Sequence, residues 1–356
     1  MSAATARSAD TDRSTGSSAG TGLVASNTRR VVGLLFWTAV LLVIIAGSLA
    51  VGAKDIPPST VWEALTAYDE SPEHVVVADL RLPRTVVGLL VGPALGVGGA
   101  LIQALTRNPL ADPGVLGVNA GAGFAVVVGV AVFGVTSIQG YIWFAFVGAI
   151  VATIAVYAIG SAGRGSPTPV RLTLAGVALA AVLGGVSNGI TLLNPDVFDR
   201  MRYWGAGSLA GRTMEMGAWV APFILIGLVL AFAAARPLNA VALGDDLARS
   251  VGSNIAATRV VVVIAVTLLC GAATAAAGPI GFVGLMVPHV ARWTVGPDQR
   301  WIVAYAVLLA PIVLLGSDIL GRIVAAPGEL QVGIVTAFVG APVLIALVRR
   351  SKASGL

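Results

Sequence analysis

The sequence predicts an all-α polytopic membrane protein with about ten transmembrane helices. Of its 356 residues, 57% are apolar and only 11% are charged, and the mean hydropathy is +0.91. Soluble globular domains carry about 25% charged residues. The apolar residues also gather in runs of about 20, which is the length that an α-helix needs to cross the hydrocarbon core of a bilayer.

The first predicted span, Val31–Val51, follows a polar tail. Residues 1–30 are rich in Ser, Thr, Ala and Gly and lack apolar periodicity, so we expect a disordered cytoplasmic tail. The apolar run exceeds the roughly 7–15 apolar residues of a secretory signal, which favours an uncleaved helix. Ser48–Ala50 resembles a cleavage site, so removal of this helix is the alternative.

Nine further spans follow, after the polar and acidic stretch Gly52–Leu80. The eighth span is short, and we expect Pro279 and Gly281 to enter the membrane as irregular backbone. The predicted segments are Thr85–Leu105, Gly114–Phe133, Tyr141–Gly160, Arg171–Leu193, Met216–Ala235, Ser253–Ala275, Gly281–Trp293, Trp301–Ile323 and Val332–Val348.

The second span carries a row of small residues. Gly88, Gly92 and Gly96 are spaced four apart, and Ala100 and Ala104 continue the row. Residues four apart lie on one face of a helix, and small residues there let a neighbouring helix approach closely within lipid. We therefore expect this span to pack tightly against another helix.

The cationic residues predict the orientation. With ten spans both termini lie on one side, and 15 of the 22 Lys and Arg residues fall on that side. Because cytoplasmic loops are enriched in Lys and Arg, both termini are predicted to be cytoplasmic. This topology signal accounts for the net charge of +5, and we predict no nucleic-acid partner.

The sequence contains no catalytic or metal-binding pattern. There is no G-x-x-x-x-G-K-[ST] motif, so ATP could act only through a separate subunit. His74 and His289 are far apart, and Cys270 lies alone in an apolar run. Since a metal site needs several ligands, we predict no metal, no cofactor and no enzymatic activity.

One acidic residue falls inside a predicted span near its end. Asp318 stands four residues before Arg322, so the two can pair on one helix face. The pair could be structural or functional. Buried carboxylates mark ion-coupled carriers, and their scarcity here argues against a proton-driven carrier.

The longest predicted internal loop, Arg236–Asn254, contains a short helix. Asp245 or Asp246 can cap its start and Gly252 can end it. Such a helix could dock a cytoplasmic partner, or the segment could be a solvated connector.

Five motifs together resemble the permease subunits of the iron-siderophore and vitamin B12 ABC importers, the FecCD type, over about Val31–Arg350. Segments Arg171–Leu183 and Leu192–Leu209 look most like the D-type permease subunit of ferric-enterobactin importers. The motifs are RLPR (Arg81–Arg84), ALTRNPLADPGVLGVNAGA (Ala104–Ala122), GPIGFVGLMVPHVAR (Gly278–Arg292), SDILGR (Ser317–Arg322) and GELQVGIVTAFVGAPVLIALVRR (Gly328–Arg350).

The resemblance implies the type II permease fold of the vitamin B12 importer, with one transmembrane domain over residues 31–350. It implies a dimer of permeases, two cytoplasmic ATPase subunits and an extracytoplasmic siderophore-binding protein. The D-type match implies a similar but distinct second permease, with a homodimer as the alternative.

The resemblance also assigns roles to residues. Arg81, Arg84 and Arg322 match arginines that receive carboxylates of the binding protein, although the first two could instead anchor a helix start. Two further sets of residues follow. The ATPase coupling loop is Leu243, Gly244, Asp245, Asp246, Leu247, Ala248, Arg249, Ser250 and Gly252. Candidates for the pathway lining are Thr173, Ser187, Asn188, Thr191 and Thr336.

The sequence therefore predicts a permease subunit that moves a ferric siderophore across the cytoplasmic membrane, with a catecholate of the enterobactin type as the expected cargo. Two alternatives remain: a permease for cobalamin or haem in the same importer class, and an ion-coupled secondary transporter.

Overall fold

The computed structural model describes residues 27–52, 54–162, 169–250 and 252–353, and all regular structure in these ranges is helical. The predicted tail lies outside the described residues up to position 26. The elements are α1 (Asn27–Ala50), α2 (Pro58–Thr66), α3 (Pro72–Val75), η1 (Val76–Arg81), α4 (Leu82–Thr106), η2 (Pro113–Leu116), α5 (Val118–Phe133), α6 (Ile138–Ser161), α7 (Pro169–Leu193), α8 (Pro195–Trp204), α9 (Met214–Ala242), α10 (Asp245–Ser250), α11 (Ile255–Ala277), α12 (Val283–Val295), α13 (Gln299–Val324) and α14 (Val332–Ala353).

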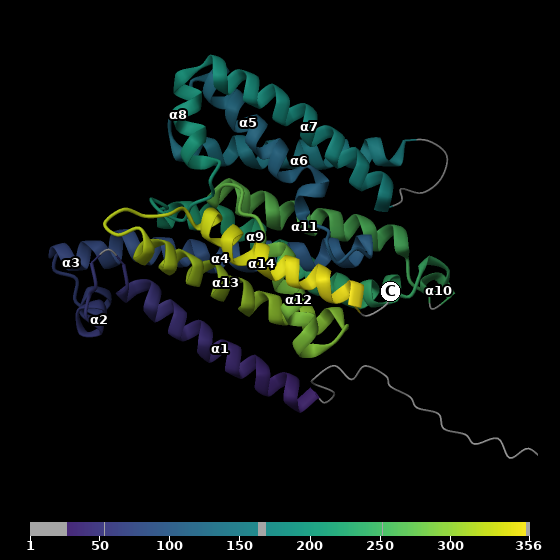
Figure 1. The fold of residues 1–356 in the computed structure, drawn as a ribbon, viewed down its shortest axis with the longest axis horizontal. Helices are drawn as coiled ribbons and strands as arrows, with labels where there is room; N and C mark the ends of the chain where they lie inside the picture. Colours follow the sequence, from purple (N-terminus) through teal and green to yellow (C-terminus); the bar gives the residue numbers. More distant parts are fainter. Residues whose placement is uncertain (1–26, 53, 163–168, 251, 354–356) are drawn as a thin grey trace, which may run out of the picture.

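Each of the ten predicted spans coincides with a helix, which confirms the all-α membrane fold. Within the described ranges, seven helices are long and apolar enough to cross a membrane by length and composition. Helix α5 and the Val332–Ala346 part of α14 are shorter apolar segments, and α12 has 13 residues. Figure 1 shows α2, α3 and α8 at one end of the molecule, and α10 with the end of α14 at the other. We call these the α8 end and the α10 end.

Helix α4 lies at the centre of the bundle, where it contacts α9, α11, α12 and α13. Its apolar window is 83% buried, compared with 6% for α1 and 17% for α7. Helices α5, α6 and α7 form a separate layer above this core in Figure 1. The helix that the sequence marks by its small residues is therefore the one around which the others pack.

The glycine row of α4 faces α13. A Cβ atom added at Gly92 would stand 2.6 Å from the Cα of Pro311, and one added at Gly96 would stand 2.5 Å from the Cβ of Ala310. Gly88 meets the side chain of Leu315 one turn away. The predicted close helix approach is confirmed, because any side chain on this row would push the two backbones apart.

The predicted start of the loop at Arg236 is wrong, because α9 continues to Ala242. Leu238 and Val241 are three residues apart and almost fully buried, so the apolar helical spacing extends past the charged residue. The loop that remains before α11 is therefore shorter, and α10 occupies half of it.

Two polar connections contain helices that hydropathy does not reveal. The acidic stretch after α1 contains α2, α3 and η1, and α8 follows α7. Asn194 caps α8 by accepting hydrogen bonds from the backbone N–H groups of Asp196 and Val197 at 3.1 and 3.3 Å, and Pro195 is its first residue. This Asn-Pro pair is a helix-start signal that the sequence did contain.

The short helix α12 is preceded by a non-helical segment, Gly278–Phe282. This is the irregular backbone that was expected from the short eighth span. Gly278 and Phe282 both have positive φ, at 76° and 67°. The loop after α8 covers this break, because the backbone N–H of Ser208 donates to the carbonyl of Ala277 at 2.7 Å. The break is thus covered by protein, as irregular backbone in a membrane requires.

Replacing Gly92 with Ala is expected to lower the unfolding midpoint of the purified protein, because the added methyl group meets the backbone of Pro311. Overpacking of this kind costs about 1–3 kcal/mol. Gly316→Ala in α13 is the matched control, since a Cβ there meets nothing within 4 Å. Scanning fluorimetry in detergent measures both variants; equal midpoints for the two would contradict the packing argument.

Candidate functional site

A buried group of charges joins α4, α13 and the α13–α14 connection at the α8 end. We call Arg84, Asp318, Arg322 and Glu329 the Asp318 cluster. Arg84 Nη2 and Nε lie 2.7 and 3.1 Å from Asp318 Oδ1, and its Nη1 donates to Glu329 Oε2 at 2.7 Å. Arg322 Nη2 lies 3.1 Å from Asp318 Oδ2. Two cations and two carboxylates balance, so the cluster is formally neutral.

Two arginines also hold the end of α1. Arg322 Nη1 donates to the carbonyl oxygens of Ser48 and Val51 at 2.9 and 3.0 Å. Arg81 Nη1 donates to the carbonyls of Leu49 and Ala50 at 2.8 and 2.6 Å. The last carbonyls of a helix have no partner within the helix, and guanidinium groups satisfy them here.

The structure brings the three predicted docking arginines together at one end, but it buries them. Arg81, Arg84 and Arg322 are 6%, 7% and 2% exposed. The predicted pairing of Asp318 with Arg322 is present, whereas its closer contact with Arg84 was not foreseen because 234 residues separate the two. The side chain of Glu329 is the exposed member of the cluster, at 39%.

Helix α10 forms where the sequence placed a short helix. Leu243 and Leu247 are 64% and 57% exposed, while Ala248 is fully buried. Gly244 and Gly252 flank the helix with positive φ, at 109° and 78°, and the N–H of Gly252 donates to the Arg249 carbonyl at 3.0 Å. Leu247 of α10 and Leu243, which precedes the helix, are therefore exposed, while Ala248 holds the other face of α10 against the protein.

The predicted pathway residues divide between two environments. On α7, Asn188 is exposed and Thr173, Ser187 and Thr191 are half-buried. At 3.6 residues per turn these four positions fall in one stripe along the helix. Thr336 on α14 is fully buried and donates to the Gly333 carbonyl at 3.0 Å, so it faces no open surface in this conformation.

The turn between α4 and η2 is fastened at the α10 end. His289 Nε2 lies 2.8 Å from the carbonyl oxygen of Pro109, and Arg107 Nε donates to the Val241 carbonyl at 2.9 Å. Arg292 Nη2 donates to Gln103 Oε1 at 2.6 Å. His289 is therefore a packed, hydrogen-bonded residue, and within the described ranges no three His, Cys, Asp or Glu residues form a metal-binding group.

A family model for the FecCD transport family matches residues 40–350. The chain is 53% identical to the ferric enterobactin transport system permease protein FepD of Escherichia coli K12, over 91% of this chain and 96% of that protein. It is 40% identical to the iron(3+)-hydroxamate import system permease protein FhuB of Bacillus subtilis 168, over 86% and 79% of the two chains.

The hemin transport system permease protein HmuU of Yersinia pestis is 33% identical to the chain, over 90% and 96% of the two sequences. A solved structure described as the inward-facing conformation of a metal-chelate type ABC transporter superposes with a TM-score of 0.79. It covers 90% of this chain and 99% of its own at 24% identity, which shows a common fold.

Asp318→Asn is expected to destabilise the protein strongly, because Glu329 is then the only carboxylate of the cluster for the two buried cations Arg84 and Arg322. Breaking a buried pair by removing one partner costs about 3–5 kcal/mol. Glu329→Gln, at the exposed edge of the same cluster, is the control, with an expected cost of about 0–1 kcal/mol. Unfolding midpoints and yields measure the difference; equal stability of the Asp318→Asn and Glu329→Gln variants would show that Asp318 is not the centre of the cluster.

Proposed function

Because the chain belongs to the FecCD transport family, we propose that it is a membrane permease subunit of an ABC importer that carries a ferric siderophore into the cell. The 53% identity to the ferric enterobactin permease, across nine-tenths of the chain, is the observation that supports this cargo. A catecholate siderophore is therefore the proposed substrate, and the chain is a transporter subunit rather than an enzyme.

We propose that the α10 end faces the cytoplasm and the α8 end faces outward. The start of α1 and the end of α14 lie at the α10 end (Figure 1), where the positive-inside rule places both termini. The importer would contain a second permease, similar but distinct, with two ATPase subunits at the α10 end and a siderophore-binding protein at the α8 end.

The ATPase subunit would bind α10. The exposed Leu247 of α10 and Leu243 just before it fit an apolar pocket of a partner, whereas a solvated connector would gain nothing from exposing them. The short helix abuts α9 and α11, so movement of the docked ATPase would reach two long helices directly. This contact would couple ATP binding to alternating access at the pathway.

The binding protein would dock at the exposed edge of the Asp318 cluster. Arg84 is already engaged by Asp318, but its Nη1 meets a glutamate that is half-exposed. A carboxylate of the binding protein could replace Glu329 at this position by an equivalent charge-assisted hydrogen bond. Arg81 and Arg322 would act by fixing the end of α1 beneath this surface.

The pathway would run between the two permeases, along the polar stripe of α7 and the neighbouring face of α14. Helix α7 is among the least buried long helices, and exposed apolar residues such as Phe338, at 77%, lie on α14. These surfaces suit contact with a second permease or with a bulky cargo. Asp318 pairs with both Arg84 and Arg322. These contacts argue against a proton-carrying role for its carboxylate and hence against the ion-coupled alternative.

Uptake by a host that lacks its own siderophore permeases tests the cargo. Iron uptake is expected from ferric enterobactin when the whole importer is supplied, and it should disappear when the ATPase is inactivated. Ferric hydroxamate, haem and cobalamin form the comparison set, because relatives carry the first two. Preference for haem or cobalamin would replace the siderophore assignment, and uptake with the inactive ATPase would refute the ABC mechanism.

Leu247→Asp is expected to weaken ATPase association and to abolish uptake, because it places a carboxylate on the face of α10 that contacts the partner. Loss of one buried leucine contact and burial of a charge cost about 2–4 kcal/mol at an interface. Leu80→Asp on η1 is the control, since Leu80 is equally exposed, at 57%, but lies at the opposite end. Co-purification of the ATPase measures the effect, and equal recovery with both variants would restore the connector interpretation.

A further inference from the structure

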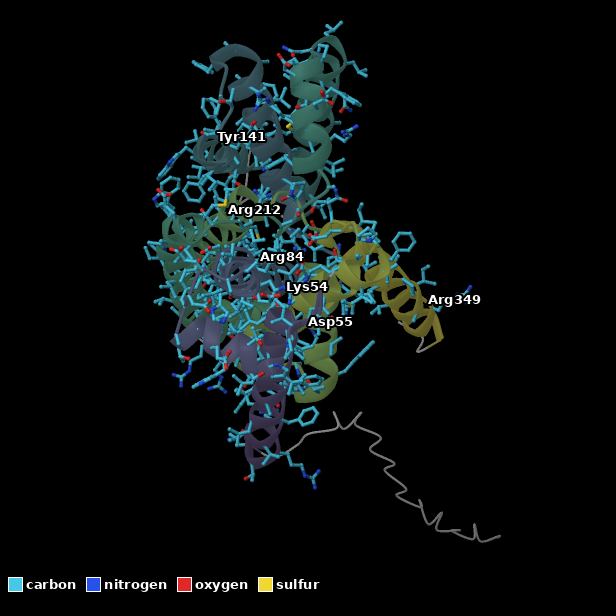
Figure 2. The ribbon with its side chains drawn as sticks, turned by 90° about the vertical axis from the view of Figure 1, so that its left-hand side faces the viewer. Lys54, Asp55, Arg84, Tyr141, Arg212 and Arg349 are labelled. Carbon is cyan, nitrogen blue, oxygen red and sulfur yellow. The ribbon has the colours of Figure 1, made fainter. Side chains whose placement is uncertain are left out.

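A second cationic feature at the α8 end lies beside the Asp318 cluster and shares Glu329 with it. A cavity of about 280 Å³ opens there between α6, α8, the loop after α8 and the connection between α13 and α14. We call it the Arg212 pocket, and its polar lining comprises Arg200, Ser208, Arg212, Glu329 and Gln331. Figure 2 looks onto this end and shows Arg212 between Tyr141 and Arg84.

Arg212 is a buried cation without a counterion. It is 7% exposed, and its Nε donates to the Ser208 carbonyl at 3.1 Å. Among the described residues, nothing accepts a hydrogen bond from its two terminal nitrogens, and no carboxylate forms an ion pair with it. Burial lowers the pKa of Arg212 to about 10, so the guanidinium is still charged at neutral pH.

The other groups of the pocket do not supply the missing negative charge. Arg200 adds a second cation and donates to the carbonyl of Thr136 and to the hydroxyl of Tyr141, at 3.0 and 2.9 Å. Glu329 is the only carboxylate among the lining residues, and its Oε2 is held by Arg84 at 2.7 Å. The pocket therefore favours an anion.

Backbone hydrogen bonds hold the segments that form the wall of the pocket. The N–H of Ser208 donates to the Ala277 carbonyl at 2.7 Å, and the N–H of Gly333 donates to the Gly207 carbonyl at 3.1 Å. Gly207 has a φ of 67° and fits against Pro279, where a Cβ would stand 2.5 Å from the carbonyl oxygen. The loop that carries Arg212 is thus fixed to the break before α12 and to the start of α14.

We propose that the Arg212 pocket is an anion-binding subsite that receives a negatively charged edge of the ferric chelate when the binding protein releases it. The proposal rests on the proposed function, since that function places the pocket at the outer mouth and beside α14. Three doubly charged catecholates around Fe³⁺ form a complex with a multiple negative charge. Its oxygens can accept hydrogen bonds from the terminal N–H groups of Arg212. At about 280 Å³ the cavity holds part of such a ligand, because pockets that enclose whole drug-sized ligands span about 300–1,000 Å³.

The cargo is favoured over a carboxylate of the binding protein for two reasons. Arg212 lies on the wall of a cavity, so a ligand that enters the cavity reaches it, whereas a docking protein first meets Glu329, whose side chain is 39% exposed. Leu330 and Gln331, which line the pocket, lead directly into α14, the helix proposed to border the pathway. Docking by a carboxylate remains a distinguishable outcome of the test.

The test compares four permease variants in the complete importer, reconstituted in nanodiscs. Arg212→Gln removes the charge, Arg212→Lys retains it, and Gln331→Glu places a carboxylate in the pocket. Arg202→Gln is the matched control, because Arg202 is an exposed arginine of α8 outside the pocket lining. Binding of ferric enterobactin is measured by tryptophan quenching without binding protein, and affinity for the empty binding protein is measured separately.

Arg212→Gln and Gln331→Glu are expected to weaken ferric enterobactin binding about tenfold or more, which corresponds to the loss of one or two charge-assisted hydrogen bonds. Arg212→Lys should remain within about threefold of the wild type because it keeps the positive charge, and Arg202→Gln should bind like the wild type. Affinity for the empty binding protein should be unchanged in all four. Binding of an uncharged ferric hydroxamate should be insensitive to these substitutions.

Two results would overturn the proposal. Equal binding by the Arg212→Gln and Arg202→Gln variants would remove the subsite, and weaker docking of the empty binding protein to Arg212→Gln would assign Arg212 to the docking surface. If Arg212→Gln does not assemble, Gln331→Glu decides alone, because it adds the missing counterion. If the wild-type importer takes up ferric enterobactin and the variants also bind it normally, only the subsite is refuted. If the wild-type importer does not take up ferric enterobactin, the proposed function is refuted.

Discussion

The structure depends on how closely helices can approach α4. In lipid, apolar side chains gain little from meeting one another, so association relies on close packing of backbones. Glycines of α4 admit Pro311 and Ala310 of α13 on one side, while Gly98 and Gly99 admit Cys270 of α11 and the backbone of Gly284 on α12. One small-residue helix thus packs against three neighbours, and the Asp318 cluster forms where it meets α13.

The α8 end shows two ways of handling buried charge. In the Asp318 cluster each guanidinium meets a carboxylate or helix-end carbonyls, so the burial cost is offset within the chain. At Arg212 the cost is not offset by any described carboxylate, although both sites lie at the same end of the molecule. A neutral cluster suits a structural or docking role, whereas an unmatched cation suits a ligand that comes and goes.

Much of the fold was predictable because membrane-spanning helices are recognised in the sequence as long apolar runs. The ten spans, the glycine row and the short helix near Asp246 all follow from local sequence patterns. The burial of Arg84 could not be predicted, since its partner is 234 residues away and the pair exists only after α4 and α13 have packed. Helix α8 was overlooked because it is short and amphipathic. The burial of Arg212 could not be predicted, because it results from the way in which the loop after α8 encloses this side chain.

The fastened turn after α4 has a mechanical consequence. Arg107 ties this turn to the last turn of α9, which leads into α10, and His289 of α12 ties it to Pro109. A movement of α10 is therefore transmitted to the ends of α4 and α9 and to the middle of α12, instead of bending a single loop. From Thr106 at this turn, α4 runs about 33 Å to Arg84 of the Asp318 cluster, at 1.5 Å per residue, so the same helix links the proposed ATPase contact to the proposed outer mouth.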